Sequence, residues 1–124
     1  MGEKKKILII DDEKDLVDLL SQRLEAYGYD VVAAYDGEEG LDKARKTHPN
    51  LILLDIMMPK MDGYQVCRFL KFDEDFKNVP VVMLTARSQE SDVKVGKSVG
   101  ADDYITKPFE SADLLAIIKK HLGE

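Results

Sequence analysis

The sequence has little cysteine, little histidine and no tryptophan: one Cys and two His occur among its 124 residues. A single cysteine, Cys67, excludes an internal disulfide and suits a reducing compartment, so we expect a cytoplasmic location. Cys67 falls within a helical pattern, and we interpret it as a buried thiol.

Long apolar runs and a positive net charge are also missing. No stretch approaches the length of a membrane span, and no signal-peptide pattern opens the chain. The formal net charge is −6, so the surface as a whole repels nucleic acid and anionic membranes. We therefore expect no direct binding to either, and we interpret the basic run at residues 4–6 as a solvated end.

What is present is an ordinary globular composition, with 44% hydrophobic and 34% charged residues. The length is that of one domain, and no repeat, linker or low-complexity segment divides it. We predict a single domain over residues 1–124.

Short aliphatic runs alternate with amphipathic segments along the whole chain. Runs rich in Ile, Leu and Val are typical of strands buried on both faces, and helical spacing predicts the crossovers between them. Such alternation predicts an α/β fold, with a parallel sheet covered by helices on both sides. We predict strands over Lys6–Ile10, Val31–Tyr35, Leu51–Asp55, Pro80–Thr85 and Asp103–Thr106, and helices over Lys14–Tyr27, Glu38–Lys46, Tyr64–Lys71, Gln89–Val99 and Ala112–Leu122.

Four of the predicted helices have one apolar face, whose residues are expected to point towards the sheet; the segment Gln89–Val99 has a weaker helical pattern, with Gly96 and mostly small apolar residues. Leu19 lies at the edge of the first face, Ile117 points away from the last one, and Ser111 is the expected N-cap of the last helix. The expected inward residues are Leu16, Val17, Leu20, Leu24 and Tyr27 in the first helix, Leu41 and Ala44 in the second, Val66, Phe69 and Leu70 in the third, and Leu114, Leu115, Ile118 and Leu122 in the last.

Polar side chains stand at the carboxyl ends of four predicted strands. Asp11 and Asp12 follow the first strand, Asp55 ends the third, Thr85 ends the fourth and Lys107 follows the fifth. Ligands of parallel sheets bind beyond these ends. A lone Asp at a strand end is usually a cap or turn residue, but five such groups on four strands are hard to assign to capping. The acids that we do assign to caps and turns are Asp36, Asp62 and Asp92.

The grouped aspartates would carry more negative charge than Lys107 can offset. Close like charges repel by about 4 kcal/mol at an effective dielectric of 20. Either some carboxylates stay protonated or a divalent cation binds, and an all-oxygen set suits Mg²⁺, with Mn²⁺ as a substitute. No His or Cys belongs to the set, which argues against zinc.

A cation on one side and Lys107 on the other define a place for a phosphoryl group. Thr85 could donate a hydrogen bond to one of its oxygens. Asp55 stands between the acidic pair and Thr85, so it is the best candidate for a nucleophile that forms an aspartyl phosphate.

Four segments of the sequence carry a family resemblance. They are Ile9-Ile10-Asp11-Asp12, Leu54–Pro59 with Asp62-Gly63, Leu84-Thr85-Ala86, and Gly100–Phe109. In this order they resemble the receiver domain of bacterial two-component response regulators; together they are highly specific, and the resemblance covers essentially the whole chain. The resemblance implies a flavodoxin-like doubly wound fold with strand order 2-1-3-4-5.

The resemblance also implies roles for the residues at the strand ends. Asp55 would accept a phosphoryl group from the phosphohistidine of a sensor kinase. Asp11 and Asp12 would hold Mg²⁺, together with Asp55 and the backbone carbonyl of Met57. A protein of this kind catalyses its own phosphorylation and is not a turnover enzyme.

The same resemblance implies a switch around the phosphoryl group. Lys107 would pair with that group, Thr85 would hydrogen-bond to it, and Tyr104 would turn inward as the aromatic switch residue. The Lys107–Pro108 bond is commonly cis in the family, and the sequence leaves its state open.

The expected partners are a sensor histidine kinase or phosphotransfer protein and a downstream effector. We expect the output surface on the last two helices and the strand between them, where a homodimer could also form. No effector domain is expected in this chain, which could be a stand-alone regulator or an excised receiver. The candidate contacts are Ile117 and the Val93–Val99 segment for output, and Leu19 with Lys14, Asp15, Asp18 and Arg23 for the kinase.

Two residues are expected to tune the lifetime of the phosphorylated form. Met57 and Arg87 lie two positions after Asp55 and Thr85, near the path of an attacking water. Met57 cannot orient that water by hydrogen bonding, so we predict slow self-hydrolysis.

The competing interpretations are weaker. A Mg²⁺-dependent phosphatase with an Asp nucleophile usually needs a second carboxylate where Met57 stands. A nucleotide or flavin binder would need a glycine-rich phosphate loop, but Asp11-Asp12-Glu13 would repel phosphates. A degenerate receiver would not need the intact set of five polar groups.

Overall fold

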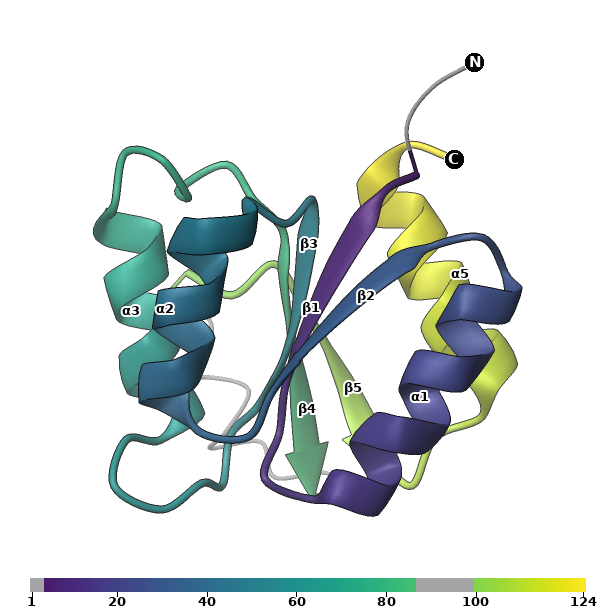
Figure 1. The fold of residues 1–124 in the computed structure, drawn as a ribbon, viewed down its shortest axis with the longest axis horizontal. Helices are drawn as coiled ribbons and strands as arrows, with labels where there is room; N and C mark the ends of the chain where they lie inside the picture. The colour runs from purple at the N-terminus through teal and green to yellow at the C-terminus, as the bar shows by residue number, and fades with distance from the viewer. Residues whose placement is uncertain (1–3, 87–99) are drawn as a thin grey trace.

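Five parallel strands form one sheet in a computed structural model that describes residues 4–86 and 100–124. The strand order is β2-β1-β3-β4-β5 (Figure 1), which confirms the predicted order and direction. The strands are β1 (Lys6–Ile10), β2 (Asp30–Ala34), β3 (Leu51–Asp55), β4 (Val81–Ala86) and β5 (Asp103–Lys107).

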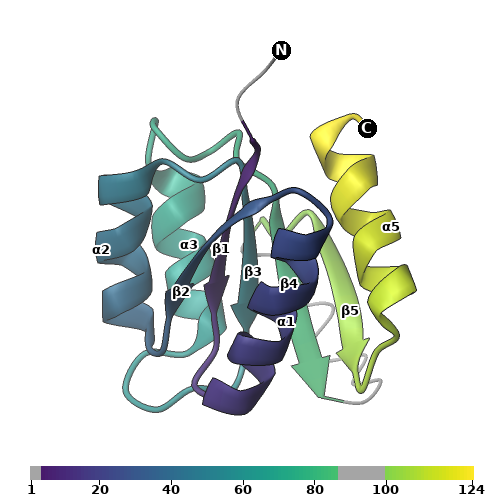
Figure 2. The same ribbon diagram turned by 45° about the vertical axis from the view of Figure 1, so that its right-hand side comes forward.

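Helices cover both faces of this sheet, as predicted. The helices α1 (Lys14–Ala26) and α5 (Ser111–Leu122) lie on one face, and α2 (Gly37–Thr47) and α3 (Gly63–Phe72) lie on the other (Figure 2). The predicted helix over Gln89–Val99 lies outside the described residues. Among the residues that are described, no helix is long and apolar enough to span a membrane.

The two central strands are buried on both faces because their apolar residues alternate between the two helical layers. Ile9 and Leu53 pack towards α1 and α5, whereas Ile10 and Leu54 pack towards α2 and α3. All four side chains are fully buried. Each contributes about 1.5–3 kcal/mol by leaving water, so the ends of β1 and β3 are anchored by fully buried side chains.

Capping side chains fix where two of the helices begin. Asp36 accepts a hydrogen bond from the backbone of Glu39 (2.7 Å) at the start of α2. Asp62 and Gln65 form a reciprocal capping box at the start of α3. The predicted cap roles of Asp36 and Asp62 are confirmed, and Asp92 lies outside the described residues.

Every predicted element that the structure describes lies within one residue of its observed bounds, but some side-chain directions were wrong. Tyr27 is 54% exposed because α1 ends at Ala26 and the chain turns through Gly28 at φ +100°. Phe69 is 56% exposed because Cys67 packs beside Val66 and Leu70, which moves the buried stripe of α3 away from it. Cys67 is buried, as expected.

The start and one face of α5 also differ from the prediction. The N-cap is Glu110, and Ser111 is the first helical residue, whose hydroxyl accepts a hydrogen bond from Arg23 on α1. Ile117 does not point away from the sheet. It is half-buried and packs at the rim of the core layer under α1 and α5.

Candidate functional site

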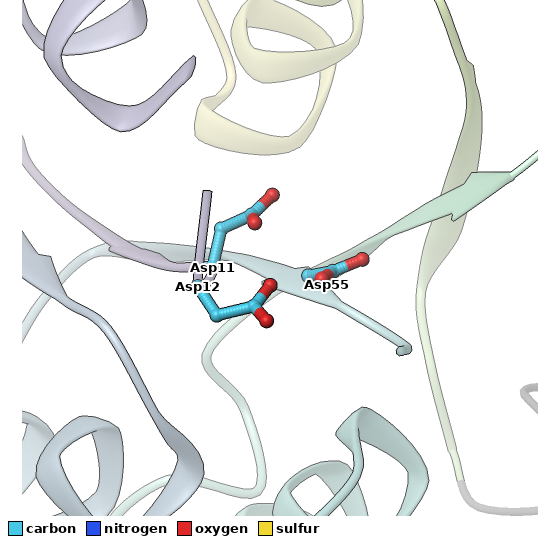
Figure 3. A group of neighbouring side chains, drawn as sticks. All are labelled: Asp11, Asp12 and Asp55. Carbon is cyan, nitrogen blue, oxygen red and sulfur yellow. The ribbon is translucent and has the colours of Figure 1, made fainter. Parts of the chain in front are cut away.

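Three aspartates meet at the carboxyl ends of β1 and β3. These strands are neighbours, with Ile10 opposite Leu54, so Asp11 and Asp12 follow β1 directly beside Asp55. One carboxylate oxygen from each residue lies within 4.8 Å of the others (Figure 3). Asp11 is fully buried, Asp55 is 5% exposed and Asp12 is exposed. Two acids have therefore been removed from water in one small volume.

Backbone contacts hold these aspartates in place. The N–H of Asp11 donates to the carbonyl of Ala34 (3.1 Å), which keeps the end of β1 against β2. The N–H of Gly63 donates to the carbonyl of Ile56 (2.9 Å), which ties the loop after β3 to the start of α3. Gly63 lies so close to the Asp55 backbone that a Cβ atom would collide with the Asp55 carbonyl oxygen. The position of Asp55 therefore depends on a glycine there.

Lys107 reaches into this group from the end of β5. Its Nζ lies 2.8 Å from Asp11 Oδ2, 3.0 Å from Glu13 Oε1 and 3.4 Å from Asp55 Oδ1. The Lys107–Pro108 peptide bond is cis. The predicted convergence of Lys107 with the aspartates is therefore present. Glu13 is a fourth carboxylate that we did not expect to contact Lys107, and its place directly after Asp12 was the available signal.

The electrostatics of the group reflect burial and excess negative charge. Burial and the nearby charge of Asp11 raise the pKa of Asp55, which lies at about 7 as the net result. Lys107 and a hydrogen bond from the Met57 backbone oppose this rise. Burial would lower the pKa of Lys107, but its hydrogen bond to Asp11 and the charges of Asp11 and Asp55 raise it above the ordinary value. Lys107 therefore stays charged without fully offsetting its acidic neighbours.

The residues fit a divalent cation with oxygen ligands. The cluster consists of three aspartates, two of them buried, and burial together with the charge of Asp11 raises the pKa of Asp55, so a cation there would stabilise its ionised form. A hard cation such as Mg²⁺ prefers such oxygen donors, and one exposed ligand such as Asp12 leaves access for water.

Thr85 and Tyr104 lie on the next two strands. Thr85 is buried, and its hydroxyl contacts within residues 4–86 and 100–124 are long, 3.5 Å to the Ile105 carbonyl and 3.4 Å to the Thr106 hydroxyl. The buried hydroxyl of Tyr104 has no hydrogen-bond partner among the residues that the structure describes, and burial raises its pKa. Both hydroxyls are therefore weakly held where they are.

The two residues expected to tune lifetime have different outcomes. Met57 follows β3 with 71% of its surface exposed, so its side chain faces solvent near Asp55. Arg87 lies outside the described residues.

A model of the response regulator receiver domain family matches residues 7–119. The chain belongs to this family. The predicted resemblance is confirmed, and the protein is a receiver domain of the two-component signalling systems. In this receiver domain, the three aspartates and Lys107 lie at the edge of the sheet formed by the carboxyl ends of its strands.

Individual relatives agree with this assignment. The receiver domain is 51% identical over 120 residues to the probable transcriptional regulator ycf27 of Porphyridium aerugineum. The aligned region covers 97% of this chain and 49% of the relative. It is 44% identical to protein PilG of Pseudomonas aeruginosa, over 94% of this chain and 87% of the relative. The chain thus spans about half the length of the first relative and most of the second.

A solved structure supports the fold independently. The high-resolution structure of the chemotaxis response regulator CheY4 of Vibrio cholerae superposes with a TM-score of 0.90 at 32% identity. The match covers 95% of this chain and 98% of that one. The flavodoxin-like architecture predicted from the sequence is therefore confirmed.

Proposed function

We propose that this receiver domain accepts a phosphoryl group on Asp55 in a Mg²⁺-dependent reaction, and that the donor is the phosphohistidine of a sensor kinase or phosphotransfer protein. The observation that carries the proposal is the convergence of Asp11, Asp12 and Lys107 on one buried carboxylate. Family membership supports it, because receiver domains are signalling domains.

Asp55 is the residue suited to act as the nucleophile. A carboxylate oxygen of Asp55 attacks phosphorus, the P–N bond of the phosphohistidine breaks, and the histidine nitrogen leaves with the electron pair. Burial favours the protonated acid, so the attack needs neighbouring positive charge that keeps Asp55 ionised. Lys107, at 3.4 Å, supplies part of that charge.

Asp11, Asp12 and Asp55 would hold the Mg²⁺ ion, with the backbone carbonyl of Met57 as a further ligand. When bound, the ion neutralises negative charge on the carboxylates and on the phosphoryl oxygens. The amine of Lys107 can turn from its carboxylate partners to a phosphoryl oxygen, because its contacts with Asp11, Glu13 and Asp55 are ion pairs made by the flexible end of a lysine side chain.

Phosphorylation would change the surface through Thr85 and Tyr104. An acyl phosphate adds about two negative charges and three acceptor oxygens. The Thr85 hydroxyl, held by contacts of 3.4 and 3.5 Å, can move to donate to one of those oxygens. Tyr104 can then change position as the proposed switch residue, because its hydroxyl, already buried here, gives up no hydrogen bond within the described part of the chain. β5 and α5 would carry this change to an effector or a second copy.

The kinase or phosphotransfer partner would dock beside the site on α1. Leu19 is exposed there, as predicted, and Asp15 and Asp18 are exposed on the same helix. A phosphatase function is not favoured, because Met57 is a thioether and cannot act as the general acid that such enzymes place at this position.

Mass spectrometry of the intact protein tests the proposal. Wild type incubated with acetyl phosphate and Mg²⁺ should gain one phosphoryl group, and it should gain none with a chelator. Asp55→Asn should gain none in either case. Asp18→Asn is the matched control, because it removes the same charge from an exposed position and should behave as wild type. Labelling without Mg²⁺, or labelling retained in Asp55→Asn, would overturn the proposal.

A further inference from the structure

Glu13 occupies the N-cap position of α1 without using its side chain as a cap. Its backbone is extended, its carbonyl accepts the first helical hydrogen bond from Val17 (3.0 Å), and within the described residues its side chain makes no capping contact. The Glu13 N–H is satisfied by Asp11 Oδ1 (2.9 Å). Its carboxylate is therefore not needed for the helix and instead contacts Lys107 at 3.0 Å.

We propose that Glu13 is a positioning residue that holds Lys107 away from Asp55 in the unphosphorylated protein and so weakens the affinity of the site for phosphoryl groups. This inference rests on the proposed function of Asp55. It adds Glu13 to the three aspartates of the site, and it predicts that this fourth acid lowers the affinity for phosphoryl groups.

The amine of Lys107 has no spare hydrogen for a new partner. An ammonium has three N–H donors, and the three carboxylate contacts at 2.8, 3.0 and 3.4 Å account for all of them. The two shortest go to Asp11 and Glu13, and the longest goes to Asp55. Lys107 can donate a hydrogen bond to a phosphoryl oxygen only if it releases one of these three carboxylates.

Burial decides which partner is released most easily. The Asp11 side chain is fully buried and that of Asp55 is 7% exposed, whereas that of Glu13 is 61% exposed. A buried carboxylate that loses its partner stays out of water, but an exposed one is solvated at once. Glu13 is therefore the partner that Lys107 leaves on phosphorylation.

Glu13 also adds negative charge beside an incoming anion. Replacing it with the isosteric Gln removes both the competing ion pair and the repulsion. An exposed ion pair contributes only a small free energy, so the expected effect is an increase of about two- to fivefold in phosphoryl affinity. The direction is diagnostic, since damage to the site would lower the affinity.

The probe is beryllofluoride, a phosphoryl analogue. Mg²⁺ is present at saturating concentration, so that a change in cation affinity does not contribute. Calorimetry measures the dissociation constant of beryllofluoride for wild type, Glu13→Gln and Glu25→Gln. Glu25 is exposed on α1, and its replacement causes the same change in net charge away from the site. We expect tighter binding for Glu13→Gln alone.

A second readout reports on Lys107 directly. In nitrogen-detected NMR of lysine side chains, the Lys107 ammonium signal of the free protein should shift in Glu13→Gln and not in Glu25→Gln. Unchanged or weaker beryllofluoride binding by Glu13→Gln, with binding to wild type intact, would overturn the role of Glu13. Binding to Asp55→Asn as tight as to wild type would instead overturn the proposed function.

Discussion

The ionised Asp55 side chain destabilises the folded protein when no cation is bound. Its pKa is about 7 in the folded chain, while an Asp in an unfolded chain titrates near 4. Between these pH values the folded state binds the proton more strongly than the unfolded state. Without a cation, stability from this group is therefore lost as the pH rises from about 4 to about 7.

Asp55→Asn should remove that cost. In the absence of divalent cations we expect the variant to be more stable than wild type at pH 8, by about 1–3 kcal/mol, and nearly equal to it at pH 4. Urea unfolding at both pH values measures the difference, with Asp18→Asn as the control. A difference that is the same at both pH values would show that Asp55 is not the titrating group.

Met57 is a residue that we expect to affect how long the phosphorylated state lasts. Its exposed thioether cannot orient a water molecule, whereas an amide or carboxylate in its place could. We expect Met57→Asn to shorten the lifetime of the phosphoprotein by about tenfold, a fraction of what a full general base supplies. Decay of the phosphorylated mass with time is the measurement, and an unchanged or longer lifetime would exclude this role.

The connection from β3 to α3 depends on Gly63 because of its close approach to the Asp55 backbone. Gly63→Ala should displace that backbone and destabilise the fold by about 1–3 kcal/mol. It should also weaken beryllofluoride binding, because Asp55 moves with the loop. Leu19→Ala, an exposed change on α1, should leave both quantities near wild type. A Gly63→Ala protein with wild-type stability and binding would show that the loop adjusts freely.

Element bounds could be predicted from the sequence because local signals set them. Continuous aliphatic runs mark the strands, and Asp36 and Asp62 mark helix starts by their own hydrogen bonds. Side-chain direction was less predictable. Phe69 and Ile117 were misplaced because the width of a buried stripe depends on the neighbouring elements, which periodicity does not report.

At the scale of the whole molecule, the strand order produces the site. β1 lies beside β3, so Asp11 and Asp12 meet Asp55 although more than forty residues separate them in the sequence. This grouping could be predicted, because parallel strands align their carboxyl ends. The contact between Glu13 and Lys107 could not, since it depends on where an exposed side chain points after the last strand has joined the sheet.

A bound cation should stabilise the whole fold. Mg²⁺ at about 100 times its dissociation constant should add about 2.7 kcal/mol to the free energy of unfolding. Asp12→Asn should lose most of this gain, because Asp12 is one of the three clustered carboxylates. Urea unfolding with and without Mg²⁺ gives both values. Equal stabilisation of wild type and Asp12→Asn would place the cation elsewhere.

The most direct test of the phosphoacceptor assignment is to locate the modified residue. Borohydride reduces an acyl phosphate to an alcohol, so an aspartyl phosphate leaves homoserine at its position. After treatment with acetyl phosphate, Mg²⁺ and borohydride, peptide sequencing by mass spectrometry should find homoserine at position 55. Homoserine at position 11 or 12, with Asp55 unmodified, would contradict the assignment.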